Sequence, residues 1–397
     1  MKKNYLVMSR LAISCITFII LFVHYSCKNS NENLPEGGET IICSGESKFS
    51  LIDTTFFAQS SLIVLETTDN ALIRNINAIC IVNDTLFILD RSLKKIFIYD
   101  KKGKFIHVIQ DIGNGPHEYA SIIDICADRN QLIISCDNPY KIMRYNCLGQ
   151  FIKEESLPDY FNNVAVANGR VYLYKHGSLG RRKLGIYSEQ EQTIEEIQLP
   201  EGKYINAERD GNIYGFSSSS GRCLTASGDI LCTWPLDYTI YTIEKGTPKA
   251  KYTIDFGKRE IPQTLLEQSI SPKDFLDMID QKKYIYSMEN VVENDSYLIF
   301  QTNPSIFILD KQKKKLTEYF SIENGVLGGG DTGYLAVNGS TMIAQVHKTY
   351  FFKMQMDNCI KRNLLPKSKY ADEYLRIYKN LKEEDNPILC LYELPHK

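Results

Sequence analysis

The chain contains little of what most catalytic and nucleic-acid-binding sites require. The chain has 397 residues, among them one tryptophan, Trp234, and six histidines. Its formal net charge is −2. A nearly balanced charge gives no basic field that would attract nucleic acid, so no nucleic-acid partner is expected. A single tryptophan argues against repeat types that place one in every unit. No Cys-x-x-Cys pair occurs, which argues against zinc and thioredoxin-type sites.

Common active-site motifs are also missing. The sequence has no His-Glu-x-x-His, no P-loop and no Gly-x-Ser-x-Gly elbow. The histidines outside the two ends of the chain, His107, His117, His176 and His347, are far apart in sequence. A metal held in a central channel would need several of them to converge. We therefore expect no metal and no cofactor, and the sequence favours a protein that is not an enzyme.

The N-terminus has the pattern of an export signal. Lys2, Lys3 and Arg10 precede a short apolar run, Leu11 to Val23, that is too short for an ordinary membrane span. Cys27 follows almost directly, which resembles the lipobox of bacterial lipoproteins, where the cysteine is lipidated and becomes the first mature residue. Ordinary secretion with cleavage nearby, or an uncleaved anchor, are the alternatives.

This pattern predicts three segments: a lipoprotein signal peptide over residues 1–27 with lipidated Cys27, a flexible tether over 28–48 and a folded domain over 49–397. Residues 28–47 are rich in Asn, Ser, Glu and Gly, which is typical of a flexible tether. Several acyl chains on one cysteine hold a protein stably on a bilayer. We expect a membrane-anchored lipoprotein of the cell envelope, on the outer membrane, facing either the periplasm or the cell surface.

A stretch near residue 90 recurs 46 residues later. Lys95 and Lys141, Tyr99 and Tyr145, Gly103 and Gly149, and Phe105 and Phe151 are matched pairs with this spacing. A fixed period in the 40s, with each unit made of short strands and tight turns, is typical of a β-propeller blade. The fold class predicted is therefore all-β, a six-bladed β-propeller with two short helical insertions.

The strand pattern gives approximate limits for each blade. The six expected blades cover residues 75–110, 121–157, 161–199, 204–256, 284–322 and 334–354. The fourth is expected to include a strand over 213–216, and the sixth a strand over 350–354. One helix is predicted after Ser271, with Pro272 at its first position, and a second from Tyr370 to Leu381. Because a ring must join its ends, residues 62–65 and 388–394 are expected to share one blade.

The segment between the first two blades reads Gly-Asn-Gly-Pro-His-Glu-Tyr over residues 113–119. Together with the preceding Tyr-Asp-x-x-Gly-x-Phe over 99–105, it resembles the six-bladed β-propeller lipoproteins abundant in gut Bacteroidota, relatives of NHL-repeat propellers. This resemblance implies the propeller fold and an envelope location. It implies no settled activity.

Two interpretations of this segment remain open. Its glycines allow positive φ and its proline fixes the next turn, so the segment could simply brace the crossing between blades, with Glu118 accepting backbone N–H bonds. Alternatively it lines a ligand funnel at the channel mouth. The candidate funnel residues are Gly113, Gly115, Pro116, His117, Glu118 and Tyr119.

Most cysteines lie in apolar strand segments, where they act as small hydrophobic residues. One pair is a disulfide candidate: a hairpin turning on residues 227–228 would place Cys223 directly opposite Cys232. An oxidising envelope would permit the bridge. Two reduced neighbours are the alternative.

Three functions follow from these features. The favoured one is a lipid-anchored binding or scaffold module for a protein or glycan partner, joined to the membrane by its anchor. The alternative is a propeller enzyme, a lyase or a hydrolase of lactonase type, acting in the central funnel. The third is a purely structural role in an envelope complex. Histidines or carboxylates converging from different blades would favour catalysis, and a funnel lined by tyrosines and amides would favour binding.

Overall fold

The computed structural model describes residues 37–176, 181–199, 202–209, 212–216, 223–227, 229–326, 330–331, 336–346, 349–366 and 369–395. The chain divides into two units, Met1–Gly37 and Gly38–Lys397, and the described strands and helices all belong to the second. The signal peptide expected over residues 1–27, with the lipidation at Cys27, lies outside the described residues.

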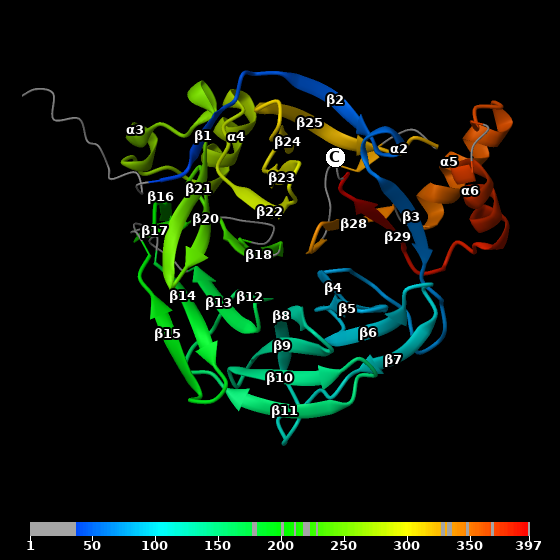
Figure 1. Ribbon diagram of the computed structural model, residues 1–397, viewed down its shortest axis with the longest axis horizontal. Helices are drawn as coiled ribbons and strands as arrows, with labels where there is room; N and C mark the ends of the chain where they lie inside the picture. The colour runs from blue at the N-terminus through cyan, green and yellow to red at the C-terminus, as the bar shows by residue number, and fades with distance from the viewer. Residues whose placement is uncertain are drawn as a thin grey trace, which may run out of the picture. The chain divides into compact units, whose positions relative to one another are not determined.

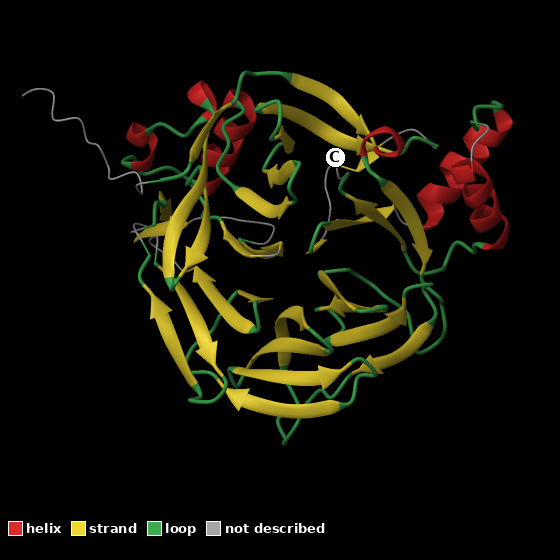
Figure 2. Ribbon diagram, viewed as in Figure 1, coloured by secondary structure: helices red, strands yellow, loops and turns green. Residues whose placement is uncertain are grey.

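Six antiparallel sheets are arranged around a central axis, as the sequence period predicted (Figures 1 and 2). Blade 1 contains β4 (Ala78–Val82), β5 (Thr85–Asp90), β6 (Lys95–Asp100) and β7 (Phe105–Ile109). Blade 2 contains β8 (Ser121–Asp128), β9 (Gln131–Asp137), β10 (Lys141–Asn146) and β11 (Phe151–Ser156). Blade 3 contains β12 (Asn163–Ala167), β13 (Arg170–His176), β14 (Arg182–Ser188) and β15 (Thr193–Ile197).

The remaining blades follow the same order from the axis outwards. Blade 4 contains β18 (Leu224–Ser227), β19 (Asp229–Cys232), β20 (Thr239–Glu244) and β21 (Thr247–Asp255). Blade 5 contains β22 (Met288–Glu293), β23 (Tyr297–Thr302), β24 (Ile306–Asp310) and β25 (Lys315–Glu323), with the short β26 (Gly330–Asp331) paired to β25. Blade 6 contains β27 (Ala336–Asn338), β28 (Thr341–Val346), β29 (Ile388–Glu393) and β3 (Gln59–Val64).

The recurring tyrosines have the same structural role in blades 1 and 2. Tyr99 on β6 and Tyr145 on β10 are both fully buried. Each packs edge to face on the phenylalanine that begins the next strand, Phe105 at 5.7 Å and Phe151 at 5.9 Å between ring centroids. Aromatic pairs in this geometry stabilise a core beyond the area they bury. The 46-residue period in the sequence therefore corresponds to a repeated packing unit.

The hydrophobic core consists of separate clusters between neighbouring blades. Six of the buried clusters in the described residues each combine strands from two adjacent blades, including the pair formed by blade 6 and blade 1. Each cluster can form only when both of its blades are in place, because one face of a sheet needs a partner to be removed from water. The ring is therefore closed by packing as well as by hydrogen bonds.

Ring closure occurs as the sequence predicted. The outermost strand of blade 6, β3, comes from the start of the domain and pairs antiparallel with β29 near its end, with Val64 opposite Ile388. Asn386, just before β29, reinforces the junction: its Nδ2 donates to the carbonyl of Glu66 at 3.0 Å, and its Oδ1 accepts from Ile73 N at 2.9 Å. Both ends of the domain are thus joined to blades 6 and 1.

The prediction of a flexible tether over residues 28–48 is wrong for the C-terminal part of that segment, which contains paired strands. Strand β1 (Glu39–Ile42) pairs parallel with β21 of blade 4, and β2 (Ser47–Ile52) pairs parallel with β25 of blade 5. The chain then forms the short helix α2 (Asp53–Phe56) before it enters β3. The composition of this segment is polar, but the parallel pairing uses backbone groups, which every residue carries. The segment spans the outer edges of two blades (Figure 1).

Two expected strands lie elsewhere. The strand predicted over 213–216 is β17 (Asn212–Phe216), which pairs with β16 (Ile205–Arg209) in a separate hairpin and not in blade 4. Blade 4 instead takes β21 as its fourth strand. The segment 350–354, predicted as a strand of blade 6, belongs to helix α5 (Thr349–Lys361). Buried residues Thr349, Phe352, Met356 and Cys359 recur at helical spacing, and the strand prediction missed that period.

The two predicted helices are present. Ser271 caps α4 (Pro272–Lys282), its hydroxyl accepting from Asp274 N at 3.1 Å, and α6 (Lys369–Asn380) covers most of the second. Helix α4, the short α3 (Gln263–Leu266) and β16 form a small satellite core around Phe275. Helices α5 and α6 pack on the cluster between blades 5 and 6 and project from the rim of the disc (Figure 2).

Candidate functional site

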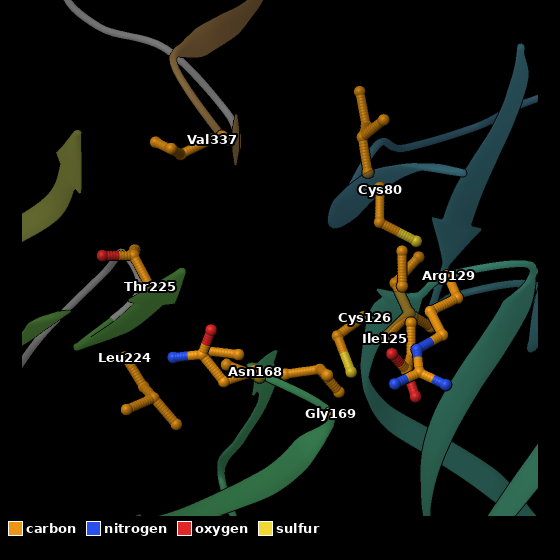
Figure 3. A pocket seen from close by; sticks show the side chains of 16 residues that line it. Cys80, Ile125, Cys126, Arg129, Asn168, Gly169, Leu224, Thr225 and Val337 are labelled. Carbon is orange, nitrogen blue, oxygen red and sulfur yellow. The ribbon is translucent and has the colours of Figure 1, made fainter. Parts of the chain in front are cut away.

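A cavity of about 660 Å³ lies where the innermost strands meet. Five of the six blades contribute to it, through β4, β8, β12, β18, β27 and the turns that follow β8, β12 and β27. Half of the residues that line it are aliphatic, and these are Ile79, Ile125, Ala127, Ala165, Val166, Ala167, Leu224 and Val337. Figure 3 shows side chains from several strands surrounding an open centre.

Polar groups also line the cavity. Asp128 ends β8 and Arg129 follows it, Asn168 follows β12, and Thr225 lies on β18. Figure 3 shows Arg129, Cys80 and Cys126 on one side of the opening, with Thr225 and Asn168 across from them. Arg129 and Asn168 are both exposed, so the guanidinium and the amide lie where the cavity meets solvent. The cavity therefore combines aliphatic surface with polar groups that could orient a ligand, as binding pockets do.

Tight turns position the groups at the opening. Arg129 and Asn168 both have left-handed backbone conformations, with φ of 49° and 52°, as two-residue hairpin turns require. Asn83, in the equivalent turn of blade 1, has φ of 53°, and its Nδ2 donates to Asn130 Oδ1 at 2.8 Å. This bond links the turns of blades 1 and 2. The opening is therefore built on fixed turns of rigid hairpins.

The wall behind the cavity is held by hydrogen bonds between blades. Thr225 donates its hydroxyl to the carbonyl of Val291 on β22 at 2.9 Å, which links blade 4 to blade 5. Asp124, fully buried on β8, accepts from Val164 N of β12 at 2.9 Å, which links blade 2 to blade 3. Because buried polar groups are costly unless paired, these bonds fix the spacing of the inner strands.

The predicted funnel segment lies at the other end of the same strand. Residues 113–119 precede β8, whereas the cavity is lined by the last residues of β8 and the turn after it. A strand that crosses the disc has its two ends on opposite faces, so the segment and the cavity opening are on different faces. This cavity is therefore not lined by Gly113, Gly115, Pro116, His117, Glu118 or Tyr119, and their placement in a funnel at the channel mouth stays a prediction.

The contacts of this segment correspond to the bracing interpretation. Glu118 Oε2 accepts from Gly115 N at 2.7 Å, and a Cβ on Gly113 would lie 2.0 Å from the same oxygen. Tyr119 is fully buried and donates its hydroxyl to the carbonyl of Lys94 at 3.0 Å. His117 stacks on Phe151, at the start of the outermost strand of blade 2, with 4.0 Å between centroids. These contacts hold the connection from blade 1 to blade 2 in a fixed conformation.

The disulfide predicted between Cys223 and Cys232 is not formed. The hairpin is shifted by one residue from the predicted register: Cys232 lies opposite Leu224, and Thr233 N donates to the carbonyl of Cys223 at 2.9 Å. Both residues are buried thiols, and burial raises the pKa of Cys232 well above its usual value. They act as small apolar residues of the core between blades 3 and 4.

The cavity residues themselves were not predicted as a site. Cys80 and Cys126 are 46 residues apart, which is the same period as the tyrosine pair, so the repeat places two thiols at equivalent positions of neighbouring inner strands. That spacing was a usable signal. Nothing in the sequence, however, distinguishes inner-strand residues that face the channel from those that face a neighbouring blade, because both positions are apolar.

The chemistry available in the cavity is limited. Its described lining contains one carboxylate, that of Asp128, and no histidine, and its other titratable side chains are those of Cys80, Cys126 and Arg129. In the part of the chain that the structure describes, no cluster of three His, Cys, Asp or Glu residues could hold a metal ion. None of the described helices is long and apolar enough to cross a membrane.

Comparisons with known proteins give the family and confirm the fold. Residues 43–393 match the family described as domain of unknown function DUF4934. The crystal structure of a Bacteroides fragilis protein described as exported is similar, with a TM-score of 0.65 and 18% identity over 90% of this chain and 100% of that one. No curated protein matches the chain in sequence.

Two further solved structures resemble the chain more weakly. The extracellular domain of a hybrid two-component system from Bacteroides thetaiotaomicron has a TM-score of 0.37 and 13% identity, over 72% of this chain and 30% of that one. A glutaminyl cyclase from Myxococcus xanthus has a TM-score of 0.34 and 8% identity, over 71% of this chain and 99% of that one.

Proposed function

Because the chain belongs to the DUF4934 family and folds as a six-bladed propeller, we propose that it is a binding module of the cell envelope, held on the membrane by acylated Cys27. The module uses the central cavity to hold part of a protein or glycan partner. The single observation that carries this proposal is the cavity of about 660 Å³, which five blades line with both aliphatic and polar groups. Pockets that hold small ligands or side chains have this size and composition.

The envelope location rests on the N-terminal residues. A basic start, a short apolar run and Cys27 directly after it are the features of a lipoprotein signal. From Cys27 to the first paired residue, Glu39, the chain has 12 residue steps (39 − 27), which span at most about 40 Å when extended. A propeller on this tether stays near the bilayer surface and can meet large envelope partners there.

The proposal is tested by closing the cavity. Val166 lines the cavity on β12 and is half-buried, so Val166→Arg places a long cation in it. Ile152→Arg introduces the same group at a 43% exposed position of β11, the outermost strand of blade 2, and serves as the matched control. Glycan arrays and crosslinking pull-downs from envelope fractions would be run with the wild type and both variants, after thermal unfolding confirms that each is folded.

We expect the wild type and Ile152→Arg to capture the same partner and Val166→Arg to lose it. Equal capture by all three proteins would move binding away from the cavity and overturn the proposal. If Val166→Arg does not fold, Ala127→Leu fills the cavity with less disturbance and gives the same comparison. The alternative is an enzyme in the funnel. The described lining offers it one carboxylate, and turnover of a captured ligand that is lost in Asp128→Asn would support it.

A further inference from the structure

A second cavity lies at the outer part of blade 5, where the N-terminal segment packs on it (Figure 1). Lys48 on β2 and Phe56 on α2 supply one part of its wall. Strands β23, β24 and β25, with the turn between the last two, supply the rest. Its volume is about 240 Å³, far more than one water needs and enough for a single sugar ring. None of its lining residues lines the central cavity.

Strand alternation places the polar side chains of this pocket on one face of the blade. Lys315, Thr317 and Tyr319 are two residues apart on β25, so they share a face. Thr317 lies opposite Ile308 of β24, and Tyr319 lies opposite Lys48 of β2. The Nζ of Lys48 lies 5.9 Å from the centre of the Tyr319 ring. Strand β2 therefore brings a lysine beside an aromatic ring at the outer end of the sheet.

The lysines of the pocket differ in whether a carboxylate balances them. Lys315 Nζ lies 2.7 Å from Glu46 Oε2, and Lys313 Nζ lies 3.2 Å from Asp310 Oδ2. Lys48 is exposed and forms no ion pair with any residue that the structure describes. The three lysines therefore face two carboxylates, which leaves an excess of one positive charge. A ligand with a single negative charge would balance it.

Two residues of the lining have hydroxyls without a hydrogen-bond partner in the described part of the chain. They are Thr317, which is 8% exposed, and half-buried Tyr319. Aromatic surface lies close by, because Phe56 packs edge to face on Tyr297 at 5.2 Å between ring centroids. Ring faces attract the polarised C–H groups of a ligand, and hydroxyls and an ammonium bind its oxygens. The pocket therefore suits a ligand that is rich in oxygen, has an apolar C–H face and carries one negative charge.

We propose that this pocket binds a hexuronic acid, a sugar that carries one carboxylate. Lys48 Nζ donates to the carboxylate, and the hydroxyls of Thr317 and Tyr319 bind oxygens of the sugar. The C–H face of the sugar packs on the aromatic surface. A neutral sugar would leave Lys48 unbalanced, and a simple carboxylate such as acetate would leave the hydroxyls and the rings unused. The site is separate from the central cavity and does not depend on the partner bound there.

Saturation-transfer NMR would follow sodium glucuronate, sodium acetate and glucose titrated into the purified protein at constant ionic strength. We expect saturable binding of glucuronate, and binding of acetate and glucose that is weaker on the order of tenfold, because each offers only part of the contacts. In a repeat at higher sodium chloride, glucuronate binding should weaken, because salt screens the attraction of an exposed lysine.

A capped sugar separates two sources of the same ligand chemistry. Methyl glucuronide is blocked at the anomeric carbon, as the residue at the end of a polysaccharide is. Binding of methyl glucuronide equal to that of glucuronate would assign the end of a polysaccharide as the ligand. Binding of glucuronate alone would assign the free sugar acid.

Two variants remove single polar groups from the pocket. Lys48→Gln removes the charge at an exposed position, and we expect it to weaken glucuronate binding on the order of fivefold, the upper end of what an exposed ion pair contributes. It should also reduce the salt dependence. Thr317→Val removes a hydroxyl at nearly constant size and should weaken binding by a similar factor. Lys249→Gln, at an exposed position of β21 in blade 4, is the matched control and should bind as the wild type does.

Thermal unfolding would first confirm that each variant is folded. If Thr317→Val does not fold, Lys48→Gln still gives the comparison, because its position is exposed. Equal glucuronate binding by the wild type and Lys48→Gln, or no saturable binding by the wild type, would overturn the proposal. Val166→Arg, which closes the central cavity, should leave glucuronate binding unchanged. Loss of glucuronate in Val166→Arg would place the sugar in the central cavity and would also overturn it.

Discussion

Gly103→Ala is the substitution that tests ring closure most directly. Gly103, in the turn between β6 and β7, has φ of 82°, and a Cβ placed on it would lie 2.0 Å from the carbonyl oxygen of Val64. Val64 ends β3, the strand that closes blade 6. The carbonyl of Gly103 also accepts from Glu66 N at 2.7 Å. An alanine here must therefore push the closing strand away from blade 1.

The expected cost can be built from its parts. Left-handed backbone costs an alanine about 1 kcal/mol relative to glycine. Moving residues 64–66 breaks the bond from Glu66 N and the bond from Phe105 N to Glu66 Oε2, at 2.8 Å, each worth about 1 kcal/mol. The total is about 3 kcal/mol of unfolding free energy.

Two other glycines provide a graded control series. Gly45 has φ of 77°, and no atom lies within 4 Å of the position that a Cβ would take, so Gly45→Ala carries the backbone cost alone, about 1 kcal/mol. Gly149 is the repeat equivalent of Gly103, but its Cβ would meet side-chain atoms of Ile98 at 2.6 Å and His107 at 2.8 Å, which can move more easily than a backbone.

Urea unfolding followed by circular dichroism would measure the three variants. We expect the loss of stability to increase from Gly45→Ala through Gly149→Ala to Gly103→Ala. If Gly103→Ala were no less stable than Gly45→Ala, contact between the closing strand and blade 1 would contribute nothing, and the account of ring closure would be refuted.

Three further predictions concern other parts of the chain. Cys27→Ala should abolish metabolic labelling with an alkyne fatty acid and release the protein from the membrane fraction; retained label would contradict the lipoprotein assignment. Asn386→Ala should cost about 3 kcal/mol in urea unfolding, because it leaves several buried groups at the ring junction unpaired, whereas exposed Asn380→Ala should cost little. Burial raises the pKa of Asp53 in the folded protein. The stability that this carboxyl contributes is therefore fully present below the pKa that it has in the unfolded chain, and it is lost as pH rises through the pKa that it has in the folded protein. Asp53→Asn should therefore stabilise the protein at pH 7, with a gain that shrinks towards about pH 4, near the ordinary pKa of an aspartate; a gain independent of pH would contradict this.

Much of the fold could be predicted because it follows from local and repeated patterns in the sequence. The matched pairs that begin with Lys95 and Lys141 predicted blades 1 and 2, and the cap at Ser271 predicted α4. The pairing of β3 with β29 followed from the need to close a ring. Blade 4 could not be assigned in the same way, because the hairpin of β16 and β17 has the same alternation as a blade strand pair. Only packing decides which hairpin enters the ring.

The residues of the cavity could not be predicted from the sequence, for a related reason. The Gly-Pro segment at 113–119 was noticeable because glycine and proline stand out, yet its Glu118 and Tyr119 make internal contacts. Half of the residues that line the cavity are ordinary aliphatic residues such as Ile125 and Val166. Whether such a residue faces a channel or a neighbouring blade depends on where the sheet lies, which strand alternation alone does not give.

The sequence by itself determined the repeat, the strand and turn chemistry, and the way the ring closes, because each depends on neighbouring residues or on a fixed period. The tertiary structure decided the rest: the parallel strands β1 and β2 at the outer edge, the one-residue shift between Cys223 and Cys232, and the groups that meet at the cavity. These features depend on contacts between segments far apart in the chain, and such contacts exist only once the blades have packed.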